Sequence, residues 1–131
     1  MSAMKPIYTE EAATPMGHYV QAMQANGMIY VSGILGVKAK DLEIIVRPLD
    51  QQVQTCLDNL KAILKAADAS LNDVVKVTIY LDDVAKWDVV NEIYTKEFGD
   101  HKPARAIVPT RGLHHGFEVE IEAIALAPTV K

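Results

Sequence analysis

The segment that most constrains the fold is residues 117–126, FEVEIEAIAL, in which apolar and polar residues alternate strictly. A β-strand sends successive side chains to opposite faces, so this alternation predicts a strand. One predicted face is apolar and the other begins with glutamates: Val119, Ile121, Ala123 and Ala125 against Glu118, Glu120, Glu122, Ile124 and Leu126. Carboxylates on a dry face are costly unless they find partners. We therefore look for a functional site here first.

A second strand-like run, ARAIVP at residues 104–109, carries Arg105 among apolar neighbours. A short segment containing Gly112 and Gly116 joins the two runs, so we expect them to pair and to bring the guanidinium close to the glutamates. Two interpretations stay open from the residues alone. Arg105 is either a structural ion-pair partner or a bidentate clamp for a substrate carboxylate, with a nearby glutamate activating water.

The rest of the chain predicts the order strand, strand, helix, strand, helix, strand, strand. The last two strands are the two runs described above. Before them we expect, in chain order, at most a short strand at Ile7–Tyr8, strands at His18–Met23 and Met28–Ser32, a helix from about Leu49 to Ala67, a strand at Val74–Leu81 and a helix at about Val84–Phe98. Asn26-Gly27 predicts a tight type I′ hairpin turn because both residues accept positive φ. In the 74–81 strand we expect Val75 to share the buried face of Val77.

Helices that lie between strands imply crossover connections and some parallel pairing. We therefore predict an α+β fold in which two helices cover one face of a mixed sheet. The 131 residues fit a single domain, residues 1–131. Because Ile124 and Leu126 remain on the uncovered face, we predict a homo-oligomer.

Four residues allow both a structural and a functional interpretation. Gly33 and Gly36 form a Gly-x-x-Gly pair, for which close structural packing is favoured over ligand contact. Cys56 lies on the apolar stripe of the first helix, which favours a buried structural thiol over a nucleophile. Asn91 lies on the buried stripe of the second helix, so its amide must be hydrogen-bonded either within the fold or to a ligand.

The composition argues against several functional classes. The formal net charge is -4 and the Lys and Arg residues are scattered, so a nucleic-acid-binding surface is not expected. The single cysteine, the absence of a signal-like N-terminus and the absence of a long apolar run predict a soluble cytoplasmic protein. His114 and His115 would point oppositely on a strand, so no metal is expected. No P-loop or dinucleotide fingerprint is present, and no cofactor is predicted.

The segments GHYVQAM, MIYVSG, LDNLKAILKAADASLNDVVKVTIYLDDVAKWDVVNEIY and HKPARAIV followed by FEVEIEAIA resemble, in this order, the reactive intermediate deaminase family, also called YjgF/Rid. The resemblance spans nearly the whole chain. It implies a chorismate-mutase-like α+β fold with a six-stranded sheet. It also implies a homotrimer with a central barrel and clefts between subunits. Active members hydrolyse 2-enamine and 2-imine carboxylates, such as 2-aminoacrylate and 2-iminopropanoate, to 2-keto acids and ammonia.

The resemblance assigns roles to seven residues. Arg105 resembles the family's substrate-carboxylate clamp and Glu120 the residue that orients the attacking water. The positions that match the lining of the cleft are Tyr19, Ser32, Gly33, Asn91 and Ile107.

The chain departs from the family pattern around the expected cleft. Ile107 replaces the usual Cys, Thr or Ser, Ile34 replaces Gln, and the usual Leu-Pro-Lys-Gly turn reads Leu113-His114-His115-Gly116 followed by Phe117. We expect these changes to alter the substrate range more than the reaction class. A non-catalytic carboxylate-binding or chaperone-like trimer is the alternative function. A ribonuclease or translation inhibitor is a weaker one.

Overall fold

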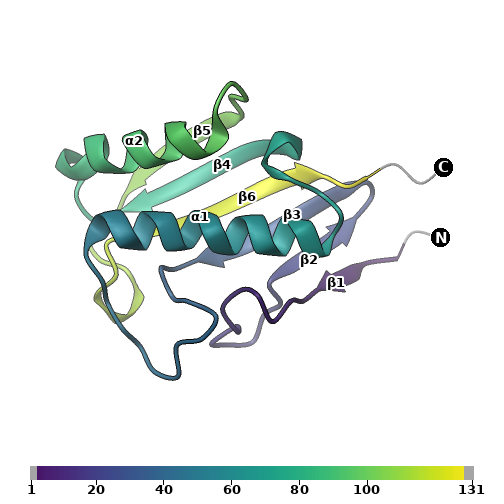
Figure 1. Ribbon diagram of the computed structural model, residues 1–131, viewed down its shortest axis with the longest axis horizontal. Helices are drawn as coiled ribbons and strands as arrows, with labels where there is room; N and C mark the ends of the chain where they lie inside the picture. Colours follow the sequence, from purple (N-terminus) through teal and green to yellow (C-terminus); the bar gives the residue numbers. More distant parts are fainter. Residues whose placement is uncertain (1–2, 129–131) are drawn as a thin grey trace.

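One six-stranded sheet forms the body of the molecule, and its strands run in the order β1-β2-β3-β6-β4-β5. The computed structural model describes residues 3–128 (Figure 1). The strands are β1 Lys5–Ile7, β2 Ala22–Ala25, β3 Met28–Ile34, β4 Val74–Leu81, β5 Ala104–Pro109 and β6 Val119–Leu126; the helices are α1 Leu49–Ala66 and α2 Trp87–Phe98, with short 3₁₀ turns η1 Leu71–Asp73, η2 Val84–Lys86 and η3 His114–Gly116. This mixed sheet with two helices confirms the predicted α+β class.

Both helices lie on the same face of the sheet (Figure 1). The apolar stripe of α1 is buried against β3 and β6, with Leu57 and Leu60 fully covered. The inward side of β6 alternates as the sequence predicted, and Val119 and Ile121 have no exposed surface. No helix among residues 3–128 is long and apolar enough to span a bilayer. The hydrophobic core therefore lies between one sheet face and the helical layer.

The first hairpin confirms its turn and corrects the start of its first strand. Asn26 and Gly27 both have positive φ, at 50° and 78°, as a type I′ turn requires. However, β2 begins at Ala22 and not at His18. The side chain of Gln21 explains this difference, because it donates to the backbone oxygens of Thr9 and Ala13 and accepts from the backbone N–H of Thr9. The segment before β2 is thus held as a loop by side-chain hydrogen bonds.

Strand β4 contains an irregularity that the alternation did not reveal. Its register with β6 shifts between Val74 and Lys76, so two β4 residues occupy the place of one. Val74 is buried while Val75 is 41% exposed. The prediction that Val75 shares the buried face of Val77 was therefore wrong. From Val77 onward the expected alternation holds.

Strands β5 and β6 do not pair, which corrects the expectation that Arg105 lies beside the glutamates. Strand β4 lies between them, paired parallel with β5 and antiparallel with β6. The crossover through α2 makes β4 and β5 parallel neighbours, as a strand–helix–strand connection requires. Strand β6 then pairs between β3 and β4. The short link between the two strands is therefore not a hairpin.

Helix α2 begins later than predicted because a separate turn precedes it. Asp83 accepts a hydrogen bond from the backbone N–H of Ala85 at 2.9 Å and so caps the 3₁₀ turn η2. The α-helix itself begins at Trp87. Its buried side includes Val90, Tyr94 and Phe98.

The face of the sheet opposite the helices carries exposed apolar side chains. Leu126 is 52% exposed, Tyr30 47% and Val108 37%. Register partners place Tyr30 opposite Ile124 on neighbouring strands, so these groups form a continuous surface rather than isolated contacts. Apolar surface of this kind on a sheet face is typical of an interface.

Gly36 permits the close approach of α1 to the end of β3. A Cβ at this position would lie 2.8 Å from the Gln52 Cα, which is backbone and cannot rotate away. We expect Gly36→Ala to lower the free energy of unfolding by about 1–3 kcal/mol, the usual cost of overpacking. Urea unfolding at equal protein concentration measures this. Gly112→Ala is the control, because a Cβ there meets no atom within 4 Å. Equal stability of the two variants would contradict this packing account.

Candidate functional site

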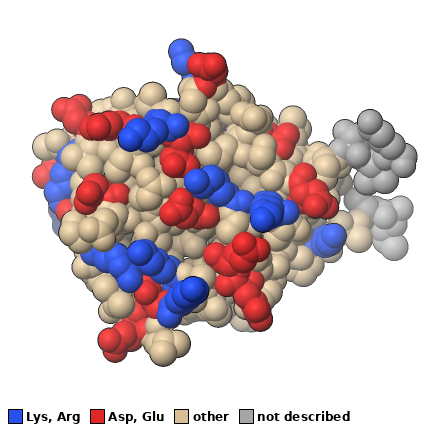
Figure 2. All heavy atoms as spheres, viewed as in Figure 1, with Lys and Arg blue, Asp and Glu red and all other residues tan. Residues whose placement is uncertain are grey.

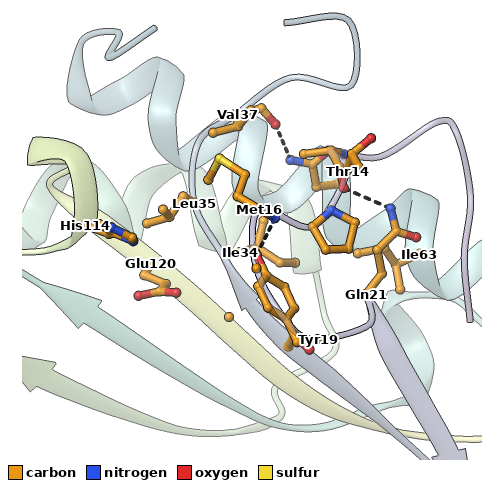
Figure 3. Close-up of a pocket in the computed structure, with 16 residues that line it drawn as sticks. Thr14, Met16, Tyr19, Gln21, Ile34, Leu35, Val37, Ile63, His114 and Glu120 are labelled. Atoms are coloured by element: carbon orange, nitrogen blue, oxygen red, sulfur yellow. Dashed lines mark hydrogen bonds between the residues drawn. The ribbon is translucent and has the colours of Figure 1, made fainter. Parts of the chain in front are cut away.

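A cavity of about 440 Å³ lies between residues 13–19, the end of β3 and the β6 residue Glu120. Figure 3 shows its labelled side chains converging from these elements. Of the residues that the family resemblance assigned, four line it: Tyr19, Ser32, Gly33 and Glu120. The cavity therefore brings together most of the predicted site.

Glu120 lies on the face of β6 that points away from the helices, and Gly33 on β3 leaves room for it. A Cβ on Gly33 would overlap the Glu120 carboxylate. Partial burial raises the pKa of Glu120 above the usual glutamate value, and the negative charge of Glu122 acts in the same direction. Within residues 3–128, no side chain or backbone N–H donates a hydrogen bond to this carboxylate. Glu120 is thus a carboxylate free to hold water in the cavity.

The other two glutamates of the alternating segment have structural partners. Glu122 accepts a hydrogen bond from the Tyr80 hydroxyl, and this bond raises the pKa of that phenol. Glu118 forms an ion pair with Lys86 and accepts from the side-chain amide of Gln52 on α1. Glu118 therefore does not share the open face with Glu120, contrary to the alternation. Glu118 and Glu122 are therefore structural charges.

The inner wall of the cavity contains two buried amides whose polar atoms are occupied by the backbone. Gln21 is 4% exposed and is fully engaged with Thr9 and Ala13. Asn59 is also 4% exposed; it donates to the Val37 oxygen at 2.7 Å and accepts from the Ala13 N–H at 3.2 Å. The remaining inner surface comes from apolar side chains including Ile34 and Ile63. Among these lining groups, the Glu120 carboxylate is therefore the one that remains available to bind water or a ligand.

Two side chains hold the segment that closes the outer edge of the cavity. The Tyr19 hydroxyl accepts from the Met16 backbone N–H at 3.3 Å (Figure 3). The Ser32 hydroxyl donates to the Val20 oxygen at 2.6 Å. Ser32 thus lines the cavity while its proton is committed to the backbone.

His114 belongs to the turn that the family resemblance puts around the expected cleft, and it lines this cavity, although the sequence assigned no role to its imidazole. The two histidines do not alternate as on a strand, because η3 is a turn in which His115 has a φ of 62°. Their rings stack with centroids 4.0 Å apart. No group of three or more His, Cys, Asp or Glu side chains in residues 3–128 lies close enough to hold a metal ion.

Arg105 lies in a second cavity, of about 370 Å³, between β5 and α2. Its guanidinium carbon is 4.6 Å from the Trp87 ring centroid and 4.8 Å from that of Tyr94, within cation–π range. Its Nη1 donates to the Asn91 side-chain oxygen at 3.1 Å. These three partners follow the i, i+4, i+7 spacing of one α2 face. Asn91 is therefore hydrogen-bonded within the fold, and it orients the guanidinium.

One chain does not bring Arg105 and Glu120 together. Arg105 is the register partner of the buried Val77, so it faces the helical layer, whereas Glu120 faces away from it. Strand β4 lies between them, which separates their strands by roughly 10 Å at the usual spacing. Ile107 lies two residues beyond Arg105, packs partly buried against the core and lines neither cavity.

Cys56 is fully buried on α1, and its thiol contacts the Ile34 carbonyl oxygen at 3.2 Å. Burial strongly raises the pKa of this thiol, and Glu120 adds to the effect. A protonated, inaccessible thiol is a poor nucleophile. The structural interpretation of Cys56 is confirmed.

This fold and these sequence segments are those of a known family. The family model described as Endoribonuclease L-PSP matches residues 9–127. The chain therefore belongs to this family, which is the YjgF/Rid family that the sequence resembles.

Similar proteins cover nearly the full length of the chain. A RutC family protein of Pyrococcus horikoshii is 43% identical over 91% of this chain and 94% of its own length. The 2-iminobutanoate/2-iminopropanoate deaminase of Mus musculus is 39% identical over 97% of this chain and 95% of its own. The crystal structure of E. coli TdcF with bound serine superimposes with a TM-score of 0.88 at 33% identity, covering 95% of this chain and 99% of that one.

Proposed function

We propose that this protein is a hydrolytic deaminase that converts 2-imine or 2-enamine carboxylates, such as 2-iminopropanoate, to 2-keto acids and ammonia. Its carboxylate clamp is Arg105, and Glu120 positions the attacking water. The observation that carries this proposal is the pair of cavities. One is lined by the Arg105 guanidinium, which packs on two rings of α2, and the other by the Glu120 carboxylate, to which no group of residues 3–128 donates a hydrogen bond. The similarity to a protein named as an imine deaminase supports the same reaction class.

The chemistry requires little beyond correct placement of substrate and water. An imine carbon is already electrophilic, so fixing the substrate carboxylate and holding a water close accelerates hydrolysis without a cofactor. The planar guanidinium of Arg105 suits bidentate capture of a carboxylate. Glu120, with its raised pKa, is a stronger base than an exposed glutamate once it is ionised. The serine in the TdcF structure is a small carboxylate, consistent with this ligand class.

The proposed site is shared between subunits of a homotrimer. Arg105 and Glu120 lie on opposite sides of the sheet in one chain, yet both must reach one small substrate. The outer edge of β5 pairs with no strand of residues 3–128, and the face carrying Glu120 also carries exposed Tyr30 and Leu126. We propose that this face packs against the β5 edge of a neighbouring subunit, so that one subunit's Arg105 and another's Glu120 reach the same substrate. The single cysteine of the protein, Cys56, is a buried free thiol, which fits the reducing environment of the cytoplasm.

A carboxylate-binding trimer without catalytic activity is the second candidate, and the apolar Ile34 in the lining of the Glu120 cavity favours it. The family description names an endoribonuclease, but this function is the weaker candidate because the acidic charge balance opposes binding to RNA. The formal net charge is -4. On the helix-covered face, Lys and Arg are interspersed with Asp and Glu rather than gathered (Figure 2).

Arg105→Ala tests the clamp, and Glu120→Gln tests the water-positioning residue. The imine is generated in situ by an amino-acid oxidase, and its loss is followed with the spontaneous rate subtracted. We expect each variant to lose about 100-fold or more in kcat/KM, the usual cost of removing a charge-stabilising group. Arg111→Ala is the matched control, since Arg111 is exposed and lines neither cavity.

Two results of this assay would contradict the proposal. If the wild-type protein binds small carboxylates but does not accelerate imine loss, the result supports the carboxylate-binding trimer without catalytic activity. Full activity in Arg105→Ala would remove the clamp from the mechanism.

Leu126→Asp tests the subunit interface on the open sheet face. A charge there cannot be buried without a large desolvation cost, so we expect light scattering to show the mass of one chain, 14.4 kDa, and deaminase activity to be lost. Leu42→Asp is the control, because Leu42 is an exposed leucine that lies in the loop before α1 and not on the sheet face. We expect it to keep three times the chain mass. A wild-type mass near 14.4 kDa would contradict the trimer.

A further inference from the structure

His114 brings an imidazole to the same cavity as Glu120. In Figure 3 the two labelled side chains lie next to each other at one end of the cavity, away from Gln21 and Ile63. The positive form of His114 lowers the pKa of Glu120, which is consistent with their proximity. The turn that carries His114 immediately precedes the strand that carries Glu120, so the relative positions of the two groups depend on a short stretch of backbone.

The local backbone holds this imidazole at the cavity. Leu113 is extended before the turn, and His115 takes a left-handed conformation at φ 62°. The His115 ring stacks on that of His114 at an interplanar angle of 11°, yet His115 does not line the cavity. The stack therefore limits the motion of the His114 ring, while only His114 faces the proposed substrate.

We propose that His114 is a second acid–base residue of this site, which exchanges protons with the substrate nitrogen and oxygen while Glu120 exchanges protons with water and the leaving amine. This inference rests on the proposed imine hydrolysis. Histidine suits the role because its imidazole gains and loses a proton near neutral pH.

The proton transfers balance over one reaction cycle. In addition, water loses a proton to the Glu120 carboxylate and its oxygen bonds to the imine carbon, while protonated His114 gives a proton to the imine nitrogen. The carbinolamine formed carries a hydroxyl and an amino group on the same carbon. In elimination, protonated Glu120 gives its proton to the amine, the C–N bond breaks and ammonia leaves. Neutral His114 accepts the hydroxyl proton as the 2-keto group forms, which regenerates both starting states.

This cycle requires an ionised Glu120 and a protonated His114 at the outset. The rate therefore falls at acid pH as Glu120 takes up a proton, and it falls at alkaline pH as the acid that protonates the imine nitrogen is lost. Among residues 3–128, the ionisable groups that line the same cavity as His114 or stack on its ring are Glu120 from β6, Tyr19 across the cavity and His115 in its own turn. A bell-shaped dependence of kcat/KM on pH is the signature of such a pair.

The experiment compares the pH dependence of kcat/KM for wild-type protein, His114→Gln and His115→Gln with 2-iminopropanoate. Glutamine keeps the size and a hydrogen-bond donor but does not titrate. We expect His114→Gln to lose about 10²-fold at the optimum, the lower end of general acid–base contributions, and to lose the alkaline decline. We expect His115→Gln to retain both limbs. Thermal unfolding of each variant shows whether the protein has remained folded.

The result that overturns this inference is a His114→Gln variant that is folded and active with the wild-type pH profile. An alkaline decline that disappears only in His115→Gln overturns it as well, because it assigns the titrating group to the outer ring. Failure of the proposed function is a different outcome: wild-type protein would then not accelerate imine loss at any pH. Activity that depends on Glu120 but not on His114 leaves the deaminase in place and removes only the second acid–base residue.

Discussion

The burial of one side of β6 under α1 is the constraint on which the rest of the structure depends. Val119 and Ile121 have no exposed surface, and their position forces Glu120 to the opposite side of the same strand. β6 is also the centre of the sheet's pairing, with β3 on one side and β4 on the other. A shift of one residue in its register would bury Glu120 among apolar groups, which is why the register is strongly specified. The hydrophobic core thus determines where the carboxylate of the site lies.

The charges of the site are held by different means on the two faces of the sheet. On the helical face, the Arg105 guanidinium packs against Trp87 and Tyr94 of α2 and donates to Asn91. These contacts restrict a long side chain without neutralising it, so its charge remains available to a ligand. On the open face, Gly33 leaves space for the Glu120 carboxylate and no described residue donates to it. Two unneutralised groups of opposite sign, kept apart within one chain, are suited to meet across a subunit boundary.

The sequence predicted the elements well because their patterns are local. Three patterns each specify a conformation within a few residues: the period-2 alternation of β6, the helical stripe of α1 and the Asn26-Gly27 turn. It failed where long-range pairing decided the outcome. No pattern in residues 104–126 indicates that β4 pairs between β5 and β6. The bulge at Val74 does not interrupt the apolar alternation of the sequence. His114 was expected near the cleft only through the family's turn, because a histidine pair gives no signal of the left-handed turn that stacks its rings. The roles of Arg105 and Glu120 came from family resemblance rather than from spacing.

The central claim is that Arg105 of one subunit and Glu120 of another form one catalytic site, and mixed trimers test it most directly. Arg105→Ala and Glu120→Gln chains, each inactive alone, are co-expressed with different tags and isolated by both tags in turn. Some sites in such trimers combine an intact Arg105 with an intact Glu120, so the account predicts that imine deaminase activity returns. Mixed trimers as inactive as either parent would contradict it.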